Sequence, residues 1–514
     1  MQWAQRVNTV RVIGTGVMGR GIAQLAAAAG LTVELADARP EAVSAAVDQI
    51  GQMFDKLAGK ARMTGADAAE ARARLQPVDG PLAPTGCDLV IEAVREDLPT
   101  KHELFAELEK ICPAHTVFVT NTSSLSVTSI ATALADPGRL AGLHFFNPVP
   151  LMRLVEVIPG ARTAEWIPGA LVDLVRRLGH EPVRATDTPG FLVNHAGRGL
   201  ITEALQILGE GLAAPADVDR IGRDVLGLRM GPFELMDLTA LDVTHPATES
   251  IWSGYYGDPR LRPSPITRSR LEAGLLGRKV GEGFYAYVDG AKQEPPEPPE
   301  PQAETRPIWS DDAELLDALG EAGVPVERGD EPSEAAVILL APYGHSAATA
   351  ALSAGLPPAR VCGVDPLSTE KRFTLTVHPA SEPGLARSAW AALAATGRSV
   401  TVVRDGAGMI AQRLLASIVN TSCFIAEQRL ATPADIDTAV RLALGYPRGP
   451  LEWGQHVGPR RVLAVLRALQ SATGDPRYRP SRWLVERAEL GLDLTETGTT
   501  PQDLLAGPAA PASS

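Results

Sequence analysis

The chain has 514 residues, 45% of them apolar, which is enough for several globular domains with buried cores. Its formal net charge of −13 argues against nucleic acid and anionic membrane surfaces as general partners, because both attract basic proteins. The four cysteines lack metal-ligand spacing, no signal-peptide pattern precedes the first predicted strand, and no apolar run is long enough to span a membrane. We therefore expect a cytoplasmic protein with no metal site.

Residues 1–186 alternate short apolar runs with amphipathic stretches, which predicts a doubly wound, parallel α/β sheet. The runs predicted as buried strands are TVRVIG, TVELAD, CDLVIEAV, VFVTNTS and LAGLHFFNP. From 187 to 288 the apolar period becomes helical, and we expect an all-α domain there.

A Pro- and Glu-rich stretch follows, and it predicts a stiff, solvated linker over 289–307. Strand and helix patterns alternate again over 308–404, and a helical pattern returns over 405–495. The tail, 496–514, is predicted to be disordered. The predicted fold is thus an α/β domain followed by an all-α domain, and then a degenerate duplicate of the same arrangement.

The two halves share a register at a constant offset of 218 residues. DTPGFLVN at 187–194 falls on DGAGMIAQ at 405–412, PADVD falls on PADID, and GPFE falls on GPLE. Such a register predicts an internal repeat.

The first predicted strand runs into GTGVMG, where Gly14, Gly16 and Gly19 have the G-x-G-x-x-G spacing around Val17 and Met18. These glycines suit a Rossmann-type domain, in which they allow a tight turn, pyrophosphate approach and close helix packing. Asp37 ends the next strand, where a carboxylate binds ribose hydroxyls and repels a 2′-phosphate. We predict NAD as the cofactor, with NADP kept open by Arg39. The second half has no such loop, and we predict that it binds no dinucleotide.

Four polar residues stand at the ends of predicted elements: Ser123, His144, Glu156 and Asn194. His144 ends a strand at the carboxyl edge of the sheet, where a histidine can act as a general base. Glu156 lies in an apolar run and needs a partner, and pairing with His144 would fix the imidazole tautomer. A histidine with a structural role is the alternative.

Together these motifs carry a family resemblance. The motifs are GTGVMGRGIA, EAVREDLPTK, NTSSL, GLHFFNPVP, LVEVI, DTPGFLVN, MGPFELMD and GRKVGEGFY. In this order they resemble the 3-hydroxyacyl-CoA dehydrogenases, densely over 1–288 and more loosely over 405–492. The resemblance implies NAD-dependent oxidation of an (S)-3-hydroxyacyl-CoA to the 3-ketoacyl-CoA.

The resemblance also implies roles for single residues. His144 would be the base and Glu156 its orienting partner, while Ser123 would bind the substrate oxygen and Asn194 would orient the substrate. The positions implied to contact the cofactor, besides the glycine loop and Asp37, are Glu96, Lys101, Asn147 and Lys279. Lys60 matches a position that contacts coenzyme A. Met53 departs from the family, which often has a serine there, and this puts the details of coenzyme A binding in doubt.

At the offset of 218, the four catalytic positions fall on Ala341, Cys362, Thr374 and Gln412, and none of these can do the same work. We therefore expect a non-catalytic second copy. Single-copy members of the family dimerise through their helical domains. The second helical domain is thus expected to act as a pseudo-dimer partner within one chain, with further homo-oligomerisation left open.

Long tandem forms resemble the dehydrogenases of aerobic phenylacetate catabolism, which act on 3-hydroxyadipyl-CoA. Arg153 and Arg198 are candidates to bind the second carboxylate of that substrate. The main alternative is a 3-hydroxybutyryl-CoA or general short-chain enzyme. More distant alternatives are a dehydrogenase of a free hydroxy acid such as gulonate, and a crystallin-like structural protein.

Overall fold

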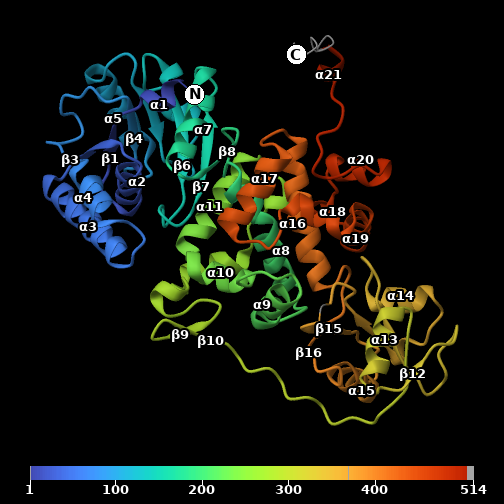
Figure 1. Cartoon of the computed structure of the whole chain (residues 1–514). Helices are drawn as coiled ribbons and strands as arrows, with labels where there is room; N and C mark the ends of the chain where they lie inside the picture. Colours follow the sequence, from blue (N-terminus) through green and yellow to red (C-terminus); the bar gives the residue numbers. More distant parts are fainter. Residues whose placement is uncertain (1, 369, 506–514) are drawn as a thin grey trace, which may run out of the picture. The chain divides into compact units, whose positions relative to one another are not determined.

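The computed structural model describes residues 2–368 and 370–505, which form two compact units (Figure 1). The first unit takes up the chain to His195 and returns for Arg429–Leu444. The second unit takes up Ala196–Gln428 and the chain from Gly445 onward. A short piece of the predicted second helical domain therefore belongs to the first unit, where the Thr186 N–H donates to the Leu430 carbonyl at 2.9 Å.

The first unit is built on an eight-stranded sheet in the order β3-β2-β1-β4-β5-β6-β7-β8. Its strands are β1 (Thr9–Ile13), β2 (Thr32–Ala36), β3 (Leu75–Pro77), β4 (Leu89–Glu92), β5 (Val117–Thr120), β6 (Leu140–Phe145), β7 (Leu154–Pro159) and β8 (Glu181–Arg184). Its helices are α1 (Gln2–Arg6), α2 (Val17–Ala28), α3 (Pro40–Gly59), α4 (Gly65–Ala73), α5 (Leu98–Ile111), α6 (Val127–Ala131), α7 (Trp166–Arg177) and, from the returning segment, α17 (Pro433–Ala439). A short 3₁₀ turn, η1 (Pro137–Arg139), leads into β6, and a π-helical turn, η5 (Val440–Leu444), follows α17.

The inner strands are mostly apolar and almost wholly buried, as a parallel sheet covered by helices requires. The exception to parallel pairing is β7, which runs antiparallel to β6. That reversal pairs His144 directly with Glu156, so the topology itself brings the two residues together.

The second unit begins with helical elements. They are α8 (Val193–Gly209), whose first turn belongs to the first unit, α9 (Pro215–Asp224), α10 (Pro232–Thr239), α11 (Leu241–Gly254), η2 (Pro259–Leu261), α12 (Pro265–Glu272) and η3 (Arg278–Val280). A small hairpin of β9 (Ala286–Val288) and β10 (Ala291–Gln293) follows. The later helical elements are α16 (Ile410–Glu427), α18 (Pro450–Val457), α19 (Pro459–Thr473), η6 (Pro476–Tyr478), α20 (Arg482–Leu490) and α21 (Pro501–Leu505).

Helices α8 and α16, which hold equivalent places in the repeat, cross in close contact. A Cβ built at Gly199 would lie 2.9 Å from the Ser417 carbonyl oxygen and 3.0 Å from the Ile418 Cα. Gly199 and Ser417 are themselves 218 residues apart, so the two helices contact each other at equivalent positions of the repeat. The buried Arg413 joins the helices further, with its Nε 2.6 Å from Glu203 Oε1.

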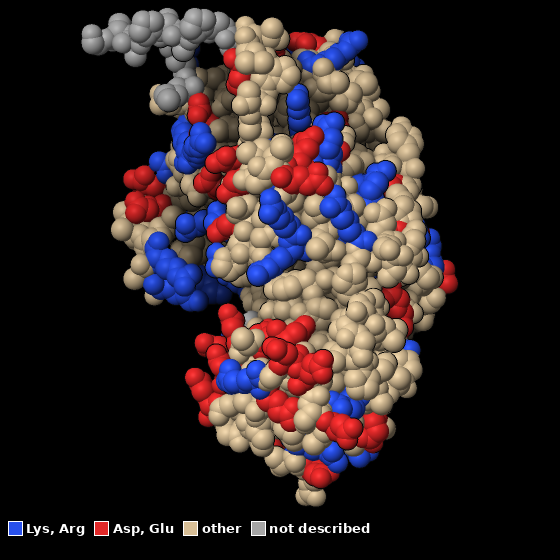
Figure 2. Space-filling model, turned by 90° about the vertical axis from the view of Figure 1, so that its right-hand side faces the viewer, with Lys and Arg blue, Asp and Glu red and all other residues tan. Residues whose placement is uncertain are grey.

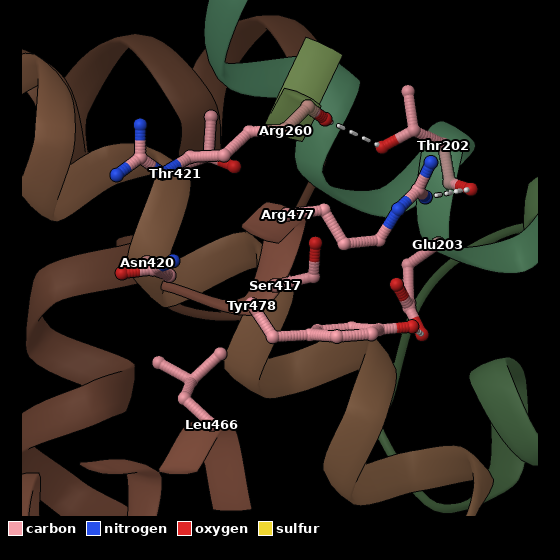
Figure 3. Close-up of a pocket in the computed structure, with 9 residues that line it drawn as sticks. All are labelled: Thr202, Glu203, Arg260, Ser417, Asn420, Thr421, Leu466, Arg477 and Tyr478. Carbon is pink, nitrogen blue, oxygen red and sulfur yellow. Dashed lines mark hydrogen bonds between the residues drawn. The ribbon is translucent and has the colours of Figure 1, made fainter. Parts of the chain in front are cut away.

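A second repeated segment lies beside the crossing of α8 and α16. GDPRLRPS at 257–264 reappears as GDPRYRPS at 474–481, and the turns η2 and η6 formed by these segments pack together. Figure 3 shows Thr202, Glu203 and Arg260 of the first copy around a small polar cavity with Asn420, Thr421 and Arg477 of the second. Each of the two repeated arginines reaches into the other copy: Arg477 Nη1 donates to the Thr202 carbonyl and Arg260 Nη2 to the Arg479 carbonyl, both at 3.5 Å.

A six-stranded sheet separates the two helical copies in sequence, in the order β12-β11-β13-β14-β15-β16. Its strands are β11 (Ile308–Ser310), β12 (Val326–Glu327), β13 (Val337–Leu340), β14 (Val361–Val364), β15 (Arg372–Val377) and β16 (Ser399–Arg404). Its helical elements are α13 (Ala313–Glu321), α14 (Ala347–Ser353), η4 (Pro358–Arg360) and α15 (Pro383–Ala394). β14 and β15 pair antiparallel, as β6 and β7 do in the first sheet.

The constant offset of 218 is wrong in this part of the repeat. The turns η1 and η4 start at Pro137 and Pro358, an offset of 221, and the offset returns to 218 at the start of β7 and β15. The loop between the antiparallel strands is shorter in the second copy, and this resets the register. His144 therefore corresponds to Asp365 and not to Cys362. The N-caps Ser126 and Ser346 are 220 apart, which places Tyr343 rather than Ala341 opposite Ser123.

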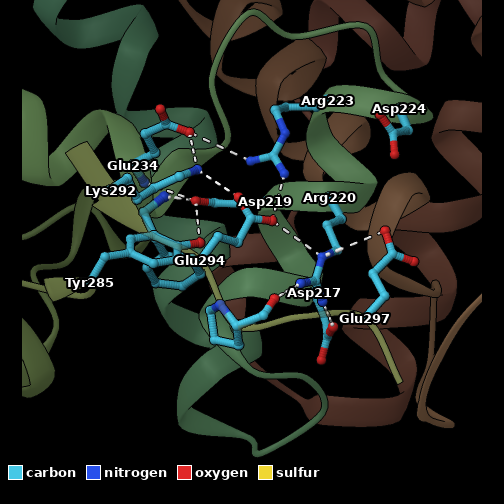
Figure 4. Close-up of polar contacts among 12 residues, drawn as sticks. Asp217, Asp219, Arg220, Arg223, Asp224, Glu234, Tyr285, Lys292, Glu294 and Glu297 are labelled. Carbon is cyan, nitrogen blue, oxygen red and sulfur yellow. Dashed lines mark hydrogen bonds and ion pairs between the residues drawn. The ribbon is translucent and has the colours of Figure 1, made fainter. Parts of the chain in front are cut away.

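The linker predicted to be stiff and solvated is also held by ion pairs (Figure 4). Glu294 pairs with Arg223 at 2.8 Å, and Glu297 pairs with Arg372 at 2.6 Å. Residues 294–307 have no regular secondary structure and are mostly exposed, as expected of a Pro-rich segment. Of the tail predicted to be disordered, Pro501–Leu505 forms α21 and residues 506–514 lie outside the described part.

Within the described ranges, no helix is long and apolar enough to cross a membrane. The same residues contain no group of three or more His, Cys, Asp or Glu side chains placed to hold a metal ion. On the face drawn in Figure 2, acidic and basic side chains both reach the surface, so this face does not carry charge of a single sign.

Candidate active site

The loop after β1 has the geometry of a dinucleotide cradle. Gly14 has φ of +98°, and a Cβ there would lie 2.5 Å from the Ala93 carbonyl oxygen. A Cβ on Gly19 would lie 1.8 Å from the Gly14 carbonyl oxygen, so α2 can approach the strand only at a glycine. Gly16, the N-cap of α2, faces open space with no atom within 4 Å of a built Cβ. The N–H groups of the first turn of α2, which begins at Val17, have no acceptor within the helix and suit a pyrophosphate.

Asp37 stands at the end of β2 beside this loop. Its Oδ2 accepts hydrogen bonds from the N–H and hydroxyl of Thr15 at 2.9 and 2.8 Å. Burial alone would raise the pKa of Asp37, but these bonds and those from Arg39 hold it below its ordinary value, so the carboxylate is charged at neutral pH. Thr15 lies inside the fingerprint, and the sequence analysis did not single it out.

The cradle opens into a cavity of about 670 Å³ within the first unit. Gly14, Gly16, Asp37, Arg39, Leu82 and Val94 are among its lining residues. A cavity of this size, with apolar walls, a carboxylate and a helix N-terminus, fits the adenosine and pyrophosphate parts of NAD.

His144 and Glu156 form a buried pair. His144 Nδ1 lies 2.6 Å from Glu156 Oε2, and the two residues are 6% and 1% exposed. Glu156 Oε1 accepts the backbone N–H groups of Leu192 and Val193 at 3.1 and 2.8 Å, where α8 begins. With Nδ1 donating to a carboxylate, Nε2 is left as the nitrogen that can take a proton. The rings of Phe146 and Phe191 pack against the imidazole.

A polar cluster links α5 to the strand ends. Glu96 Oε1 accepts from the Ser123 N–H at 2.8 Å and from the Thr122 hydroxyl at 2.7 Å. Lys101 is 1% exposed and bridges Glu96 Oε2, at 3.4 Å, and Glu92 Oε1, at 2.6 Å. Burial acts to raise the pKa of Glu96, but the Lys101 ammonium and these donors hold it below its usual value. Lys101 thus orients Glu96, which in turn fixes the loop that carries Ser123.

Glu92 was missed by the sequence analysis. It is fully buried in a strand, and its Oε2 also accepts the Thr120 hydroxyl at 2.6 Å. The signal was present, because a carboxylate inside the apolar run VIEAV needs a partner as much as Glu156 does.

The remaining predicted site residues are placed as follows. Asn194 is the second residue of α8 and half-buried, next to the N–H groups that bind Glu156. Asn147 is exposed in the loop after β6, and Lys60 is exposed at the C-cap of α3, the helix that also carries Met53. Lys279 belongs to the second unit, where it pairs with Asp242.

The second copy has rebuilt the same positions for structural contacts. Asp365, in the place of His144, is buried and accepts from the Gln412 side chain and the Ala411 N–H, both at 3.2 Å. Thr374 takes the place of Glu156, so the carboxylate that caps this helix has moved from one strand to its neighbour. Asp312 caps α13 with its own side chain and occupies the helix start where the first copy leaves room for phosphate.

A dinucleotide cradle on a sheet whose carboxyl edge carries a buried His–Glu pair defines the first unit as an NAD-dependent dehydrogenase domain. Known families agree with this class. The chain matches the 3-hydroxyacyl-CoA dehydrogenase NAD binding domain over residues 9–188. The C-terminal domain of the same family matches twice, over 190–287 and 408–500.

Individual relatives match nearly the whole chain or about half of it. The chain is 36% identical to 3-hydroxyadipyl-CoA dehydrogenase of Escherichia coli K12, over 94% of this chain and 98% of that protein. It is 38% identical to a probable 3-hydroxybutyryl-CoA dehydrogenase of Bacillus subtilis, over 55% of this chain and 98% of the relative. A crystal structure described as 3-hydroxybutyryl-CoA dehydrogenase from E. coli K12 superposes with a TM-score of 0.85 at 36% identity, covering 94% of this chain and 99% of the other. The chain belongs to the 3-hydroxyacyl-CoA dehydrogenase family of NAD-dependent oxidoreductases.

Proposed function

We propose that this enzyme oxidises the C3 hydroxyl of 3-hydroxyadipyl-CoA, with His144 as its general base. The observation that supports His144 as the general base is the 2.6 Å contact between His144 Nδ1 and the buried Glu156 Oε2. The choice of substrate rests on the length of the match, because the relative named for 3-hydroxyadipyl-CoA matches nearly the whole duplicated chain.

In this mechanism His144 Nε2 removes the hydroxyl proton of the substrate while Glu156 holds Nδ1 and offsets the charge of the imidazolium. Held by the glycine loop and Asp37, NAD would supply the acceptor for the hydride that leaves C3, so that the products would be the 3-ketoacyl-CoA, NADH and one proton on His144. We assign Ser123 to the substrate oxygen and Asn194 to substrate orientation. Buried packing by Phe146 and Phe191 keeps the imidazole in one orientation.

We assign the dinucleotide to the glycine loop and Asp37, with Glu96 and Asn147 toward its nicotinamide half. Lys101 supports Glu96 from within the protein. Lys60, exposed at the end of α3, is assigned to coenzyme A.

The substrate is tested by NADH oxidation with 3-oxoadipyl-CoA and acetoacetyl-CoA, with His144→Gln as the control. We expect a higher kcat/KM for the dicarboxyl substrate and loss of turnover of both substrates in the variant. Equal or better turnover of acetoacetyl-CoA would favour a short-chain enzyme, the function named for several relatives.

We also propose that residues 308–495 are non-catalytic and that their helical part serves as the internal partner of the first helical domain. The close crossing of α8 and α16 and the buried Arg413–Glu203 pair support this pairing. Removing the chain after Gln293 would uncover the face of α8 around Gly199. We expect the shortened protein to dimerise or aggregate in light scattering, and an active, stable monomer would contradict the proposal.

A further inference from the structure

Arg11 is a charged residue inside β1, in the apolar run TVRVIG that the sequence analysis predicted only as a strand. It is 0% exposed, and a guanidinium is costly to bury unless its donors find partners. Glu34, which lies opposite Arg11 in β2, supplies the counter-charge, with its Oε2 2.8 Å from Nε and 2.7 Å from Nη2. This ion pair offsets the charge of Arg11 and holds the guanidinium in one orientation.

The other donors of Arg11 bind the backbone of the loop between β3 and β4. Nη1 donates to the Ala83 carbonyl at 2.5 Å and to the Pro81 carbonyl at 3.3 Å, and Nη2 donates to the Pro84 carbonyl at 3.2 Å. Residues 78–88 have no regular secondary structure, and a proline has no N–H with which to fix its own backbone. One buried side chain of the central sheet therefore fixes three carbonyls of this loop.

The same loop forms a wall of the dinucleotide cavity in the first unit. Pro81 and Leu82 line the space of about 670 Å³ that is also lined by Asp37. Leu82 is 45% exposed, so a ligand in the cavity can cover its side chain. The ribose assigned to Asp37 belongs to adenosine, and the flat faces of a purine suit a wall of proline and leucine.

From these contacts we infer that Arg11 is a positioning residue for the adenosine half of NAD. It is buried and acts through the loop, by holding Pro81 and Leu82 in place as the cavity wall. A wall that is ordered before the ligand arrives does not have to be ordered at the expense of binding free energy, and the affinity is higher as a result. The inference concerns the cofactor and holds whichever acyl-CoA is the substrate.

The quantity to measure is the Kd of the full-length protein for ADP-ribose, which carries the adenosine half of NAD without the nicotinamide. We expect Arg11→Met to raise this Kd at least about tenfold in isothermal titration calorimetry, because the loop loses its anchor. With the acyl-CoA that the wild type turns over best, kcat at saturating cofactor should stay within about threefold, since the residues at the reacting atoms are unchanged. Arg11→Lys should raise the Kd less, because the charge beside Glu34 stays while the planar fork is lost.

Arg139→Met is the matched control. Arg139 lies in the same unit and also donates to two backbone carbonyls, those of Thr116 and Pro113, but neither of these is among the described residues that line the cavity. Its Kd for ADP-ribose should stay within about threefold of the wild type, even if its thermal midpoint falls.

Two results would overturn the inference. One is an Arg11→Met protein with the Kd of the wild type, and the other is an equal rise in Kd in both arginine variants, which would trace the effect to a general loss of stability. If Arg11→Met does not fold, Arg11→Lys decides, since it keeps the buried charge pair. A Kd for Arg11→Lys equal to that of the wild type would then overturn the inference.

Discussion

Glu156 serves two parts of the first unit with one carboxylate. One oxygen holds His144 and the other accepts two N–H groups at the start of α8. A glutamine there offers a single acceptor oxygen, so one of the two sets of contacts must meet an NH₂ group. The residue therefore couples the orientation of the base to the anchoring of the helix that carries Asn194.

We predict that Glu156→Gln lowers kcat by about 10²- to 10⁴-fold and also lowers the thermal midpoint of the protein. Steady-state kinetics and calorimetry on the same sample would check both effects. Ser123→Ala is the comparison, because Ser123 is exposed and its loss should lower kcat without moving the midpoint. A Glu156→Gln enzyme with unchanged stability would show that the helix start does not depend on this carboxylate.

Asp37 allows a prediction on cofactor choice. We expect Asp37→Ala to lower kcat/KM for NAD by about 10- to 100-fold, because the carboxylate that binds the ribose hydroxyls is lost. The same change should raise kcat/KM for NADP relative to NAD, since repulsion of the 2′-phosphate is removed and Arg39 remains close by. Assays with both cofactors check this, and an unchanged preference would place the discrimination elsewhere in the loop.

At the scale of elements, the crossing of α8 and α16 depends on the absence of a side chain at Gly199. We predict that Gly199→Ala lowers the free energy of unfolding by about 1–3 kcal/mol, because its Cβ would meet backbone atoms that cannot move aside. Gly209→Ala in the same helix is the matched control, since its nearest neighbour is a side-chain atom at 3.7 Å. Denaturant unfolding of both variants tests this prediction. Equal free energies of unfolding for the two variants would mean that α8 and α16 can move apart slightly without loss of stability.

Arg372, a 3% exposed residue of β15, anchors the linker through ion pairs. Its guanidinium binds Asp224 of α9 at 2.7 Å and both carboxylate oxygens of Glu297 in the linker. Arg372→Met removes this cation from two part-exposed carboxylates, while Arg220 stays 3.9 Å from Glu297, and we expect a loss of about 1–3 kcal/mol in the free energy of unfolding.

Arg328→Met breaks the exposed Arg328–Asp317 pair and should change the free energy of unfolding by less than about 1 kcal/mol. Limited proteolysis of the linker gives an independent readout, because residues 294–307 should be cut faster in Arg372→Met. Equal cleavage of the wild type and the variant would contradict a fastened linker.

The sequence predicts the strands that line the NAD cradle well, because buried parallel strands are continuous apolar runs and the glycine spacing has a steric origin. It predicts less well where long-range pairing decides. The register between β6 and β7 brings Glu156 to His144, and no local pattern reports that the two strands run antiparallel. The counterpart of His144 in the second copy could not be predicted for a related reason. A shorter loop between the antiparallel strands changes the offset between the two copies, and no local sequence pattern indicates this change. The linker contacts were missed because exposed glutamates look the same whether or not an arginine reaches them.

At the scale of the whole molecule, the duplication separates what folding requires from what chemistry requires. Asp187 and Asp405 are retained in both copies because each accepts N–H groups at the start of a short helix, α6 or α14. The base and its partner are not retained. What remains at those positions is a carboxylate, Asp365, that still meets the N-terminal end of the next long helix. The contact with a helix start is thus present in both copies, whereas the histidine is present in one.

This replacement makes the stability of the second copy depend on pH. Burial raises the pKa of Asp365 to about 6, against hydrogen bonds that act to lower it. An unfolded aspartate titrates near pH 3.9, so between about pH 4 and 6 the folded protein binds more protons than the unfolded chain. The free energy of unfolding contributed by this group is therefore largest below about pH 4 and falls as the pH rises to about 6, by at most about 3 kcal/mol.

We predict that the thermal midpoint of the wild type, relative to Asp365→Asn, rises as the pH is lowered from 7 to 4.5. Calorimetry at several pH values checks this, with Asp317→Asn, an exposed carboxylate, as the control. A difference between wild type and Asp365→Asn that stays constant with pH would show that Asp365 is ionised in the folded protein throughout this range.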